Sequence, residues 1–168
     1  MRAIAGRILW VLLFLLVLFW ALRWYPRKTV APPMVFSDAT LYVADNKNQV
    51  SINDYAGKVL IVSCFQTWCR DCAKETPLLN QLAANLPPDN FQVIYITDEN
   101  NSKLEAFRQR LDSDNILFTI STRNLASFGI HVYPTTYLLD KTGNVVLTRL
   151  EGHNWLEEEG MIRKLIEQ

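Results

Sequence analysis

Residues 58–72 read KVLIVSCFQTWCRDC and pass from an apolar run to a pair of closely spaced cysteines. The first part, Lys58–Phe65, is rich in β-branched side chains, which is typical of a central parallel strand buried on both faces. From Asp71 to Leu86 apolar residues recur at helical spacing, which predicts a helix. We therefore expect Cys69 and Cys72 at a strand-to-helix turn.

The spacing of these two cysteines suits disulfide chemistry. On the first turn of a helix, two intervening residues leave both sulfurs close enough to bond. Free N–H groups and the helix dipole at that end stabilise a thiolate, which is the attacking species in disulfide exchange. We expect Cys69, at the tip, to attack a substrate and Cys72, one turn further in, to resolve the mixed disulfide.

Strands and helices alternate on both sides of this turn. We predict strands within Phe36–Val50 and at 91–97, 116–120, 135–140 and 145–150, a helical turn at 51–57, and helices at 102–111, 124–128 and 157–168. This order predicts an α/β fold with parallel central strands.

Composition narrows the function further. The chain has 168 residues and only three cysteines, Cys64, Cys69 and Cys72, all within nine residues. They indicate a local site and not the disulfide framework of a small secreted protein. Beyond residue 30 the chain carries 12 basic and 17 acidic side chains, which argues against nucleic acid as a partner.

The amino-terminal part contains the uncharged apolar run Ile8–Leu22, which predicts a single transmembrane anchor if Arg7 and Arg23 reach the headgroups. A cleaved signal peptide is the alternative, but no small-residue cleavage site closely follows the run. We predict an anchor over 1–25, a linker over 26–34 and one domain over 35–168. Basic residues flank the run on both sides, so charge does not decide its orientation.

Two motifs resemble those of the membrane-tethered bacterial family of thioredoxin-fold oxidoreductases that includes TlpA and ResA. WCRDCAKETP, residues 68–77, matches its WC-x-x-C-x-x-E-x-P pattern, and GIHVYPTTYLLDKTG, residues 129–143, matches its G-x-x-x-x-P-T-x-x-x-x-D-x-x-G pattern. The resemblance covers about residues 35–168 and implies a thioredoxin-like fold with a mixed central sheet flanked by helices.

The resemblance also implies roles for individual residues. Pro134 is expected to be cis and to face the cysteines. Glu75 is expected near Cys72 as a proton acceptor, because the strand position where thioredoxin commonly has a buried acid is Ser63 here. These residues join Cys69 and Cys72 as candidate catalytic residues, and the candidate substrate contacts are Trp68, Tyr133 and Thr135.

The function implied is reduction of disulfides in extracytoplasmic proteins, with cytochrome c maturation as one setting. The expected location is the bacterial inner membrane, single-pass, with the domain on the periplasmic or other extracytoplasmic side. The expected partners are protein thiol or disulfide clients and a membrane electron donor. A disulfide-forming oxidase remains an alternative, as does a copper-delivery module on the same fold, although such modules use C-x-x-x-C.

No cofactor or metal is expected. Cys64 lies in the predicted buried strand, where a free cysteine acts as a small hydrophobe. An iron–sulfur cluster would need a fourth cysteine, and c-type haem attachment would need a histidine after Cys72, where the chain has Ala73. His131 and His153 are single, and we interpret both as non-catalytic.

Overall fold

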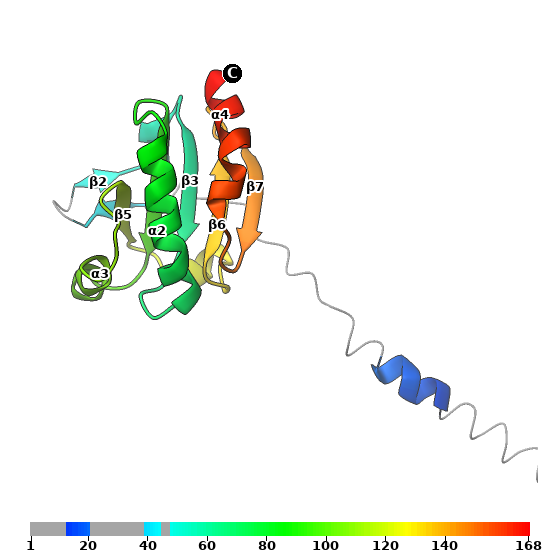
Figure 1. The fold of residues 1–168 in the computed structure, drawn as a ribbon. Helices are drawn as coiled ribbons and strands as arrows, with labels where there is room; N and C mark the ends of the chain where they lie inside the picture. The colour runs from blue at the N-terminus through cyan, green and yellow to red at the C-terminus, as the bar shows by residue number, and fades with distance from the viewer. Residues whose placement is uncertain (1–12, 21–38, 45–47) are drawn as a thin grey trace, which may run out of the picture. The chain divides into compact units, whose positions relative to one another are not determined.

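The computed structural model describes residues 13–20, 39–44 and 48–168 (Figure 1). The chain divides into two compact units, residues 1–30 and 31–168. In the first unit residues 13–20 form a helix with exposed side chains. Within the described ranges, none of the helices combines the length and apolar character that a membrane crossing requires. The predicted anchor Ile8–Leu22 extends beyond these ranges at both ends, and the predicted linker lies outside them.

The second unit is built on one seven-stranded sheet with strand order β2-β1-β5-β4-β3-β6-β7. Its described elements are, in chain order, β1 (Leu41–Val43), β2 (Gln49–Val50), η1 (Ile52–Tyr55), β3 (Val59–Cys64), α2 (Arg70–Asn85), β4 (Phe91–Thr97), α3 (Asn101–Arg108), β5 (Ile116–Ser121), η2 (Leu125–Phe128), β6 (Thr135–Leu139), β7 (Val145–Leu150), η3 (Trp155–Glu158) and α4 (Glu159–Glu167), where η marks a 3-10 helix.

Strand β3 lies inside this sheet, and all six of its residues are buried. It pairs in parallel with β4 and antiparallel with β6, while β4 pairs in parallel with β5. A strand covered on both faces has no polar side to present, which explains the continuous apolar run that the sequence shows there. The mixed sheet confirms the predicted thioredoxin-like α/β architecture.

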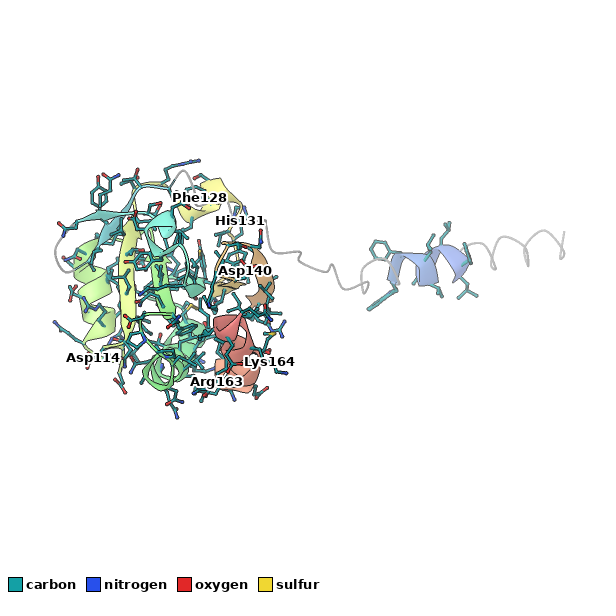
Figure 2. All side chains as sticks on the ribbon, turned by 90° about the horizontal axis from the view of Figure 1, so that it is seen from above. Asp114, Phe128, His131, Asp140, Arg163 and Lys164 are labelled. Atoms are coloured by element: carbon teal, nitrogen blue, oxygen red, sulfur yellow. A yellow bond between two sulfur atoms is a disulfide. The ribbon has the colours of Figure 1, made fainter. Side chains whose placement is uncertain are left out.

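Each face of the sheet has its own apolar core. Buried residues of α2, α3, η3 and α4 share one cluster with alternate residues of β3 and β4, and Figure 1 shows α2 and α4 over the same face. Arg163 of α4, labelled in Figure 2, joins the two helices because it donates to the Asn85 carbonyl oxygen at the end of α2 over 2.9 Å. The cluster on the opposite face includes Ile52 of η1 and Leu125 of η2.

Helix boundaries differ slightly from the expected ones, for local reasons. Helix α3 begins at Asn101 because the Asn100 side chain accepts the Lys103 N–H at 3.0 Å and caps the helix. It ends at Arg108, after which i-to-i−3 bonds tighten the chain. The helix predicted at 157–168 divides into η3 and α4.

Candidate active site

The two cysteines of the motif lie where β3 leads into α2. Cys69 is the N-cap of α2 and Cys72 is in its first turn. Their sulfurs form a disulfide, with Cα atoms 5.3 Å apart. The Cys72 backbone N–H donates to Cys69 Sγ over 3.1 Å. The same N–H is placed to stabilise a Cys69 thiolate when the pair is reduced, as its position at a helix N-terminus leads one to expect.

The two sulfur-bearing residues differ in access to solvent. Cys69 is 6% exposed and Cys72 is fully buried. An incoming thiol or disulfide therefore reaches Cys69 first. This difference supports the hypothesis that Cys69 attacks and Cys72 resolves.

The third cysteine belongs to the opposite side of the sheet. Cys64 is free and fully buried, in the cluster covered by η1 and η2, whereas Cys69 and Cys72 lie in the cluster beneath α2. Burial, with a smaller contribution from the Asp98 charge, raises the pKa of the Cys64 thiol far above its usual range. Cys64 thus behaves as a small apolar core residue, as its strand position predicts.

The loop that precedes β6 and contains Tyr133 and Pro134 contacts the loop before α2 that contains Trp68. The Tyr133–Pro134 peptide bond is cis, which confirms that prediction, and Pro134 is buried. Because Cys64 pairs with Thr135, Pro134 lies at the end of the sheet where the cysteine turn begins. Trp68 is 71% exposed, and its ring meets the Tyr133 ring edge-on with centroids 5.9 Å apart. These two aromatic side chains form a surface next to Cys69.

Two acidic residues after β4 hold the chain just before Cys69. Asp98 accepts from Gln66 Nε2 at 2.7 Å, and Glu99 accepts the Thr67 backbone N–H at 2.5 Å. Asp98 also accepts the Leu125 N–H at the start of η2. No local sequence pattern reveals these two contacts, because 32 residues and a whole helix separate each acid from its partner in the loop.

Glu75 is the buried acid of the site. It lies three residues after Cys72 on α2, a spacing that makes the two side chains neighbours on one helix face, and it is 1% exposed. Its Oε1 accepts the indole N–H of Trp155 at 2.5 Å. Its Oε2 is buried and has no hydrogen-bond partner of normal geometry among the described residues.

The electrostatics of Glu75 follow from this burial. Desolvation raises the pKa of Glu75 to about 7, while hydrogen bonds from Trp155, the His153 backbone and the Thr136 hydroxyl act in the opposite direction. Thr136 also shares a 2.8 Å hydrogen bond with Ser63. Thr136 thus connects the Glu75 carboxyl group to Ser63, the strand position at which thioredoxin commonly has an acid.

A pocket of about 360 Å³ opens beside this carboxyl group. Asp71, Lys74 and Glu75 line it from α2, and residues 151–154 line it from the segment after β7. Lys74 pairs with Asp71 at 2.7 Å on the exposed rim. Glu75 is therefore buried but lies at the wall of a space that opens to solvent.

Other predicted residues take different positions. Thr135 is buried and its hydroxyl donates to the Val132 carbonyl at 2.7 Å, so this side chain is used within the fold. His131 is exposed. His153, interpreted from the sequence only as non-catalytic, lines the pocket beside Glu75. Among the residues described, no three His, Cys, Asp or Glu side chains are grouped as a metal site needs.

Fold and site together define a thioredoxin-fold thiol–disulfide oxidoreductase whose redox pair is Cys69 and Cys72. Residues 33–148 match the profile of the AhpC/TSA family, and the chain belongs to this family. It resembles the thiol-disulfide oxidoreductase ResA of Bacillus cereus, with 26% identity over 120 residues that cover 70% of this chain and 69% of the relative. It resembles ResA of Geobacillus thermodenitrificans with 27% identity over 119 residues, 70% of this chain and 65% of that one.

Solved structures show the same fold. The thioredoxin domain of the thiol-disulfide oxidoreductase BVU-2223 from Bacteroides vulgatus superimposes with a TM-score of 0.67 at 21% identity, covering 82% of this chain and 99% of that one. A DsbE-type thiol:disulfide interchange protein from Chlorobium tepidum gives a TM-score of 0.62 at 19% identity, covering 83% and 97%.

Proposed function

We propose that this protein reduces disulfides of extracytoplasmic client proteins through the Cys69/Cys72 dithiol. One arrangement carries the proposal: Cys69 Sγ caps α2 near the surface, while a buried carboxyl group whose pKa is raised to about 7 lies one helical turn behind Cys72. Such a group can exchange a proton with a thiol near neutral pH. The redox pair therefore has its own proton acceptor.

The exchange takes two displacement steps. The Cys69 thiolate attacks a client disulfide, forming a mixed disulfide and releasing one client sulfur as a thiolate. Cys72 gives its proton to the Glu75 carboxylate and attacks Cys69 Sγ. The Cys69–Cys72 disulfide forms, and the second client sulfur leaves with the electron pair of the broken bond. The client gains two electrons, and the protein ends in the disulfide state.

Membrane attachment is the second part of the proposal. The run Ile8–Leu22 has the composition of a transmembrane anchor, and the helix at 13–20 presents large apolar side chains such as Phe14 and Phe19. We place the protein in the bacterial inner membrane, with residues 35–168 on the periplasmic or other extracytoplasmic side. Confinement to the same membrane would raise the effective concentration of the electron donor around the Cys69–Cys72 disulfide. The donor would then reduce this disulfide and regenerate the dithiol.

The family resemblance gives cytochrome c maturation as one setting for this reduction. Cytochrome c precursors carry cysteine pairs that must be thiols before haem attachment, so they belong to the client class that an extracytoplasmic reductase serves. Reduced full-length protein should convert an oxidised C-x-x-C-H peptide to the dithiol, while Cys69→Ser should not. Lack of that reaction with a peptide would exclude this setting.

The direction of electron flow is tested by the redox potential. The full chain, equilibrated with glutathione, should give a value near −270 mV, as in thioredoxin, if it is a reductase. A value near −120 mV, as in DsbA, would show instead that it is a disulfide-forming oxidase. Cys69→Ser, which cannot form the disulfide, provides the baseline.

A further inference from the structure

Trp155 is a buried residue of the site for which the exchange steps above give no role. It lies at the start of η3, is fully buried, and belongs to the apolar cluster that also holds Cys69 and Cys72. Its Nε1–H donates to Glu75 Oε1 across 2.5 Å. A buried indole N–H needs an acceptor, and here the acceptor comes from a residue 80 positions earlier.

This hydrogen bond makes the two oxygens of Glu75 unequal. An indole nitrogen donates and never accepts, so the Oε1 lone pair directed at Trp155 cannot carry a proton. Oε2 is buried and has no hydrogen-bond partner of normal geometry in the described part of the chain. Trp155 thus occupies one lone pair of Oε1 and leaves Oε2 as the oxygen better placed to take a proton, while the His153 backbone N–H and the Thr136 hydroxyl also interact with this carboxyl group.

We propose that Trp155 is a positioning residue that holds the Glu75 carboxyl group so that Oε2 takes and returns the proton of Cys72. This inference rests on the role proposed above for Glu75. When the mixed disulfide is resolved, the proton moves from Cys72 Sγ to Oε2 and afterwards to the departing client thiolate, directly or through solvent. No proton is gained or lost overall, and the electron pairs move only between sulfurs.

Several charged or titratable groups face Glu75 from the elements packed around it. Strand β4 contributes Tyr95, whose pKa is raised by burial and, to a smaller extent, by the Glu75 charge. The others are Cys72 and the Asp71–Lys74 pair on its own helix, and Glu151 and His153 across the pocket.

An outer layer of polar contacts holds Trp155 itself. The His153 ring meets the Trp155 ring edge-on with centroids 5.3 Å apart. His153 Nε2 lies 3.2 Å from Glu158 Oε1, which also accepts from Arg149 at 2.9 Å. The segment after β7 is thus fixed on both sides of the indole, so its N–H is aimed at Glu75 before any client binds.

The test uses Trp155→Phe in the full chain, which keeps an aromatic ring and removes the donor. The titration of the Glu75 carboxyl carbon, followed by ¹³C NMR in the oxidised protein, should move upward by about one pH unit or more, because a hydrogen bond to the ionised form is lost. The rate at which Cys72 resolves a mixed disulfide should show the same displacement of its pH midpoint. No displacement in either measurement would overturn the proposal.

Two controls separate positioning from packing. Ile162→Val removes one methylene group from the same cluster, where Ile162 is fully buried, and it should leave the Glu75 midpoint unchanged. In a Glu75→Gln background, adding Trp155→Phe should produce no further change in the pH profile. An equal change with and without Glu75 would show that Trp155 acts only through packing, against the proposal.

A measurement without substitution at Trp155 covers the case in which that variant does not fold. In the wild-type chain the Trp155 indole N–H resonance should shift with pH at the same midpoint as the Glu75 carboxyl carbon, and Glu75→Gln should abolish that shift. An indole resonance that ignores the Glu75 titration would refute the inference. Failure of the proposed function is seen separately, as absence of disulfide exchange by the wild-type protein, since neither NMR titration needs turnover.

Discussion

At the scale of single residues, three cysteines that lie within nine positions of each other have different roles. Cys64 faces the core under η1 and η2, whereas Cys69 and Cys72 face the core under α2. The difference comes from the alternation of side chains along β3 and from the helix that starts after it. Neighbours in sequence are thereby separated by the thickness of the sheet.

The order of attack leads to a trapping experiment. Cys72→Ser should accumulate mixed disulfides between Cys69 and client proteins, because Cys69 is the more exposed of the two cysteines and its resolving partner is gone. Cys69→Ser should accumulate none, since Cys72 is fully buried. Non-reducing electrophoresis of proteins captured from cells distinguishes the two. Cys64→Ala serves as the matched control and should keep full exchange activity; equal trapping by both active-site variants would contradict the assigned roles.

Glu75 makes stability depend on pH in a definite direction. Its pKa is raised to about 7 in the folded protein from an ordinary value of 4.5. The contribution of Glu75 to the free energy of unfolding is fully present below pH 4.5, where the carboxyl group is protonated in both the folded and the unfolded protein. It is lost as pH rises through 7, where the folded protein gives up this proton. The loss is about 3 kcal/mol, since one pKa unit corresponds to about 1.4 kcal/mol.

Glu75→Gln should remove this dependence. The amide keeps an oxygen for the Trp155 indole and cannot ionise. Urea unfolding of the oxidised proteins should show the variant gaining stability relative to wild type between pH 4 and pH 8, by up to about 3 kcal/mol. A stability difference that stays constant over this range would show that the buried carboxyl group is not perturbed as described.

At the scale of elements, the start of α2 and the segment after β7 approach closely at Gly152. A Cβ atom there would lie 3.2 Å from Asp71 Cβ and 3.5 Å from the Asp71 carbonyl oxygen. The contact is with the first turn of the helix that bears the cysteines. Glycine therefore lets the pocket wall pack against the redox helix.

Gly152→Ala should destabilise the protein by about 1 kcal/mol, because either the segment or the first turn of α2 must shift. Gly160→Ala is the matched control, since a Cβ there meets nothing within 4 Å and the residue lies in α4. That change should stabilise by about 0.5–1 kcal/mol. Thermal unfolding of both variants tests the pair, and destabilisation of equal size in both would contradict the close approach at Gly152.

Local sequence patterns predicted the elements well and their long-range contacts poorly. The apolar run of β3, the period of α2 and the Asn124–Gly129 boundary of η2 are each contained within a few residues, so spacing and capping residues reveal them. The contact between Trp155 and Glu75 spans 80 residues, and the one between Asp98 and Gln66 spans 32. No periodic pattern connects such positions, because the sheet topology brings them together.

At the scale of the whole molecule, the proposal requires the exchange domain to lie outside the cytoplasm. Basic residues flank Ile8–Leu22 on both sides: Arg2 and Arg7 before it, and Arg23, Arg27 and Lys28 after it. The positive-inside rule is thus nearly balanced, and the retained orientation must depend on small differences between the two sides. Neutralising the basic residues on one side should therefore shift the orientation in the opposite direction to neutralising those on the other side.

A reporter fused to Gln168 tests the placement. An enzyme active only in the cytoplasm should be inactive there, and one active only outside should be active. Replacing Arg2 and Arg7 by glutamine should weaken this orientation, because it removes the charge that holds the amino terminus in the cytoplasm, whereas replacing Arg23 and Arg27 should strengthen it. Activity of the cytoplasmic reporter in the unaltered chain would overturn the extracytoplasmic placement. The exchange chemistry of Cys69 and Cys72 would survive that result, since it depends on the geometry of α2, but its clients would then be cytoplasmic proteins.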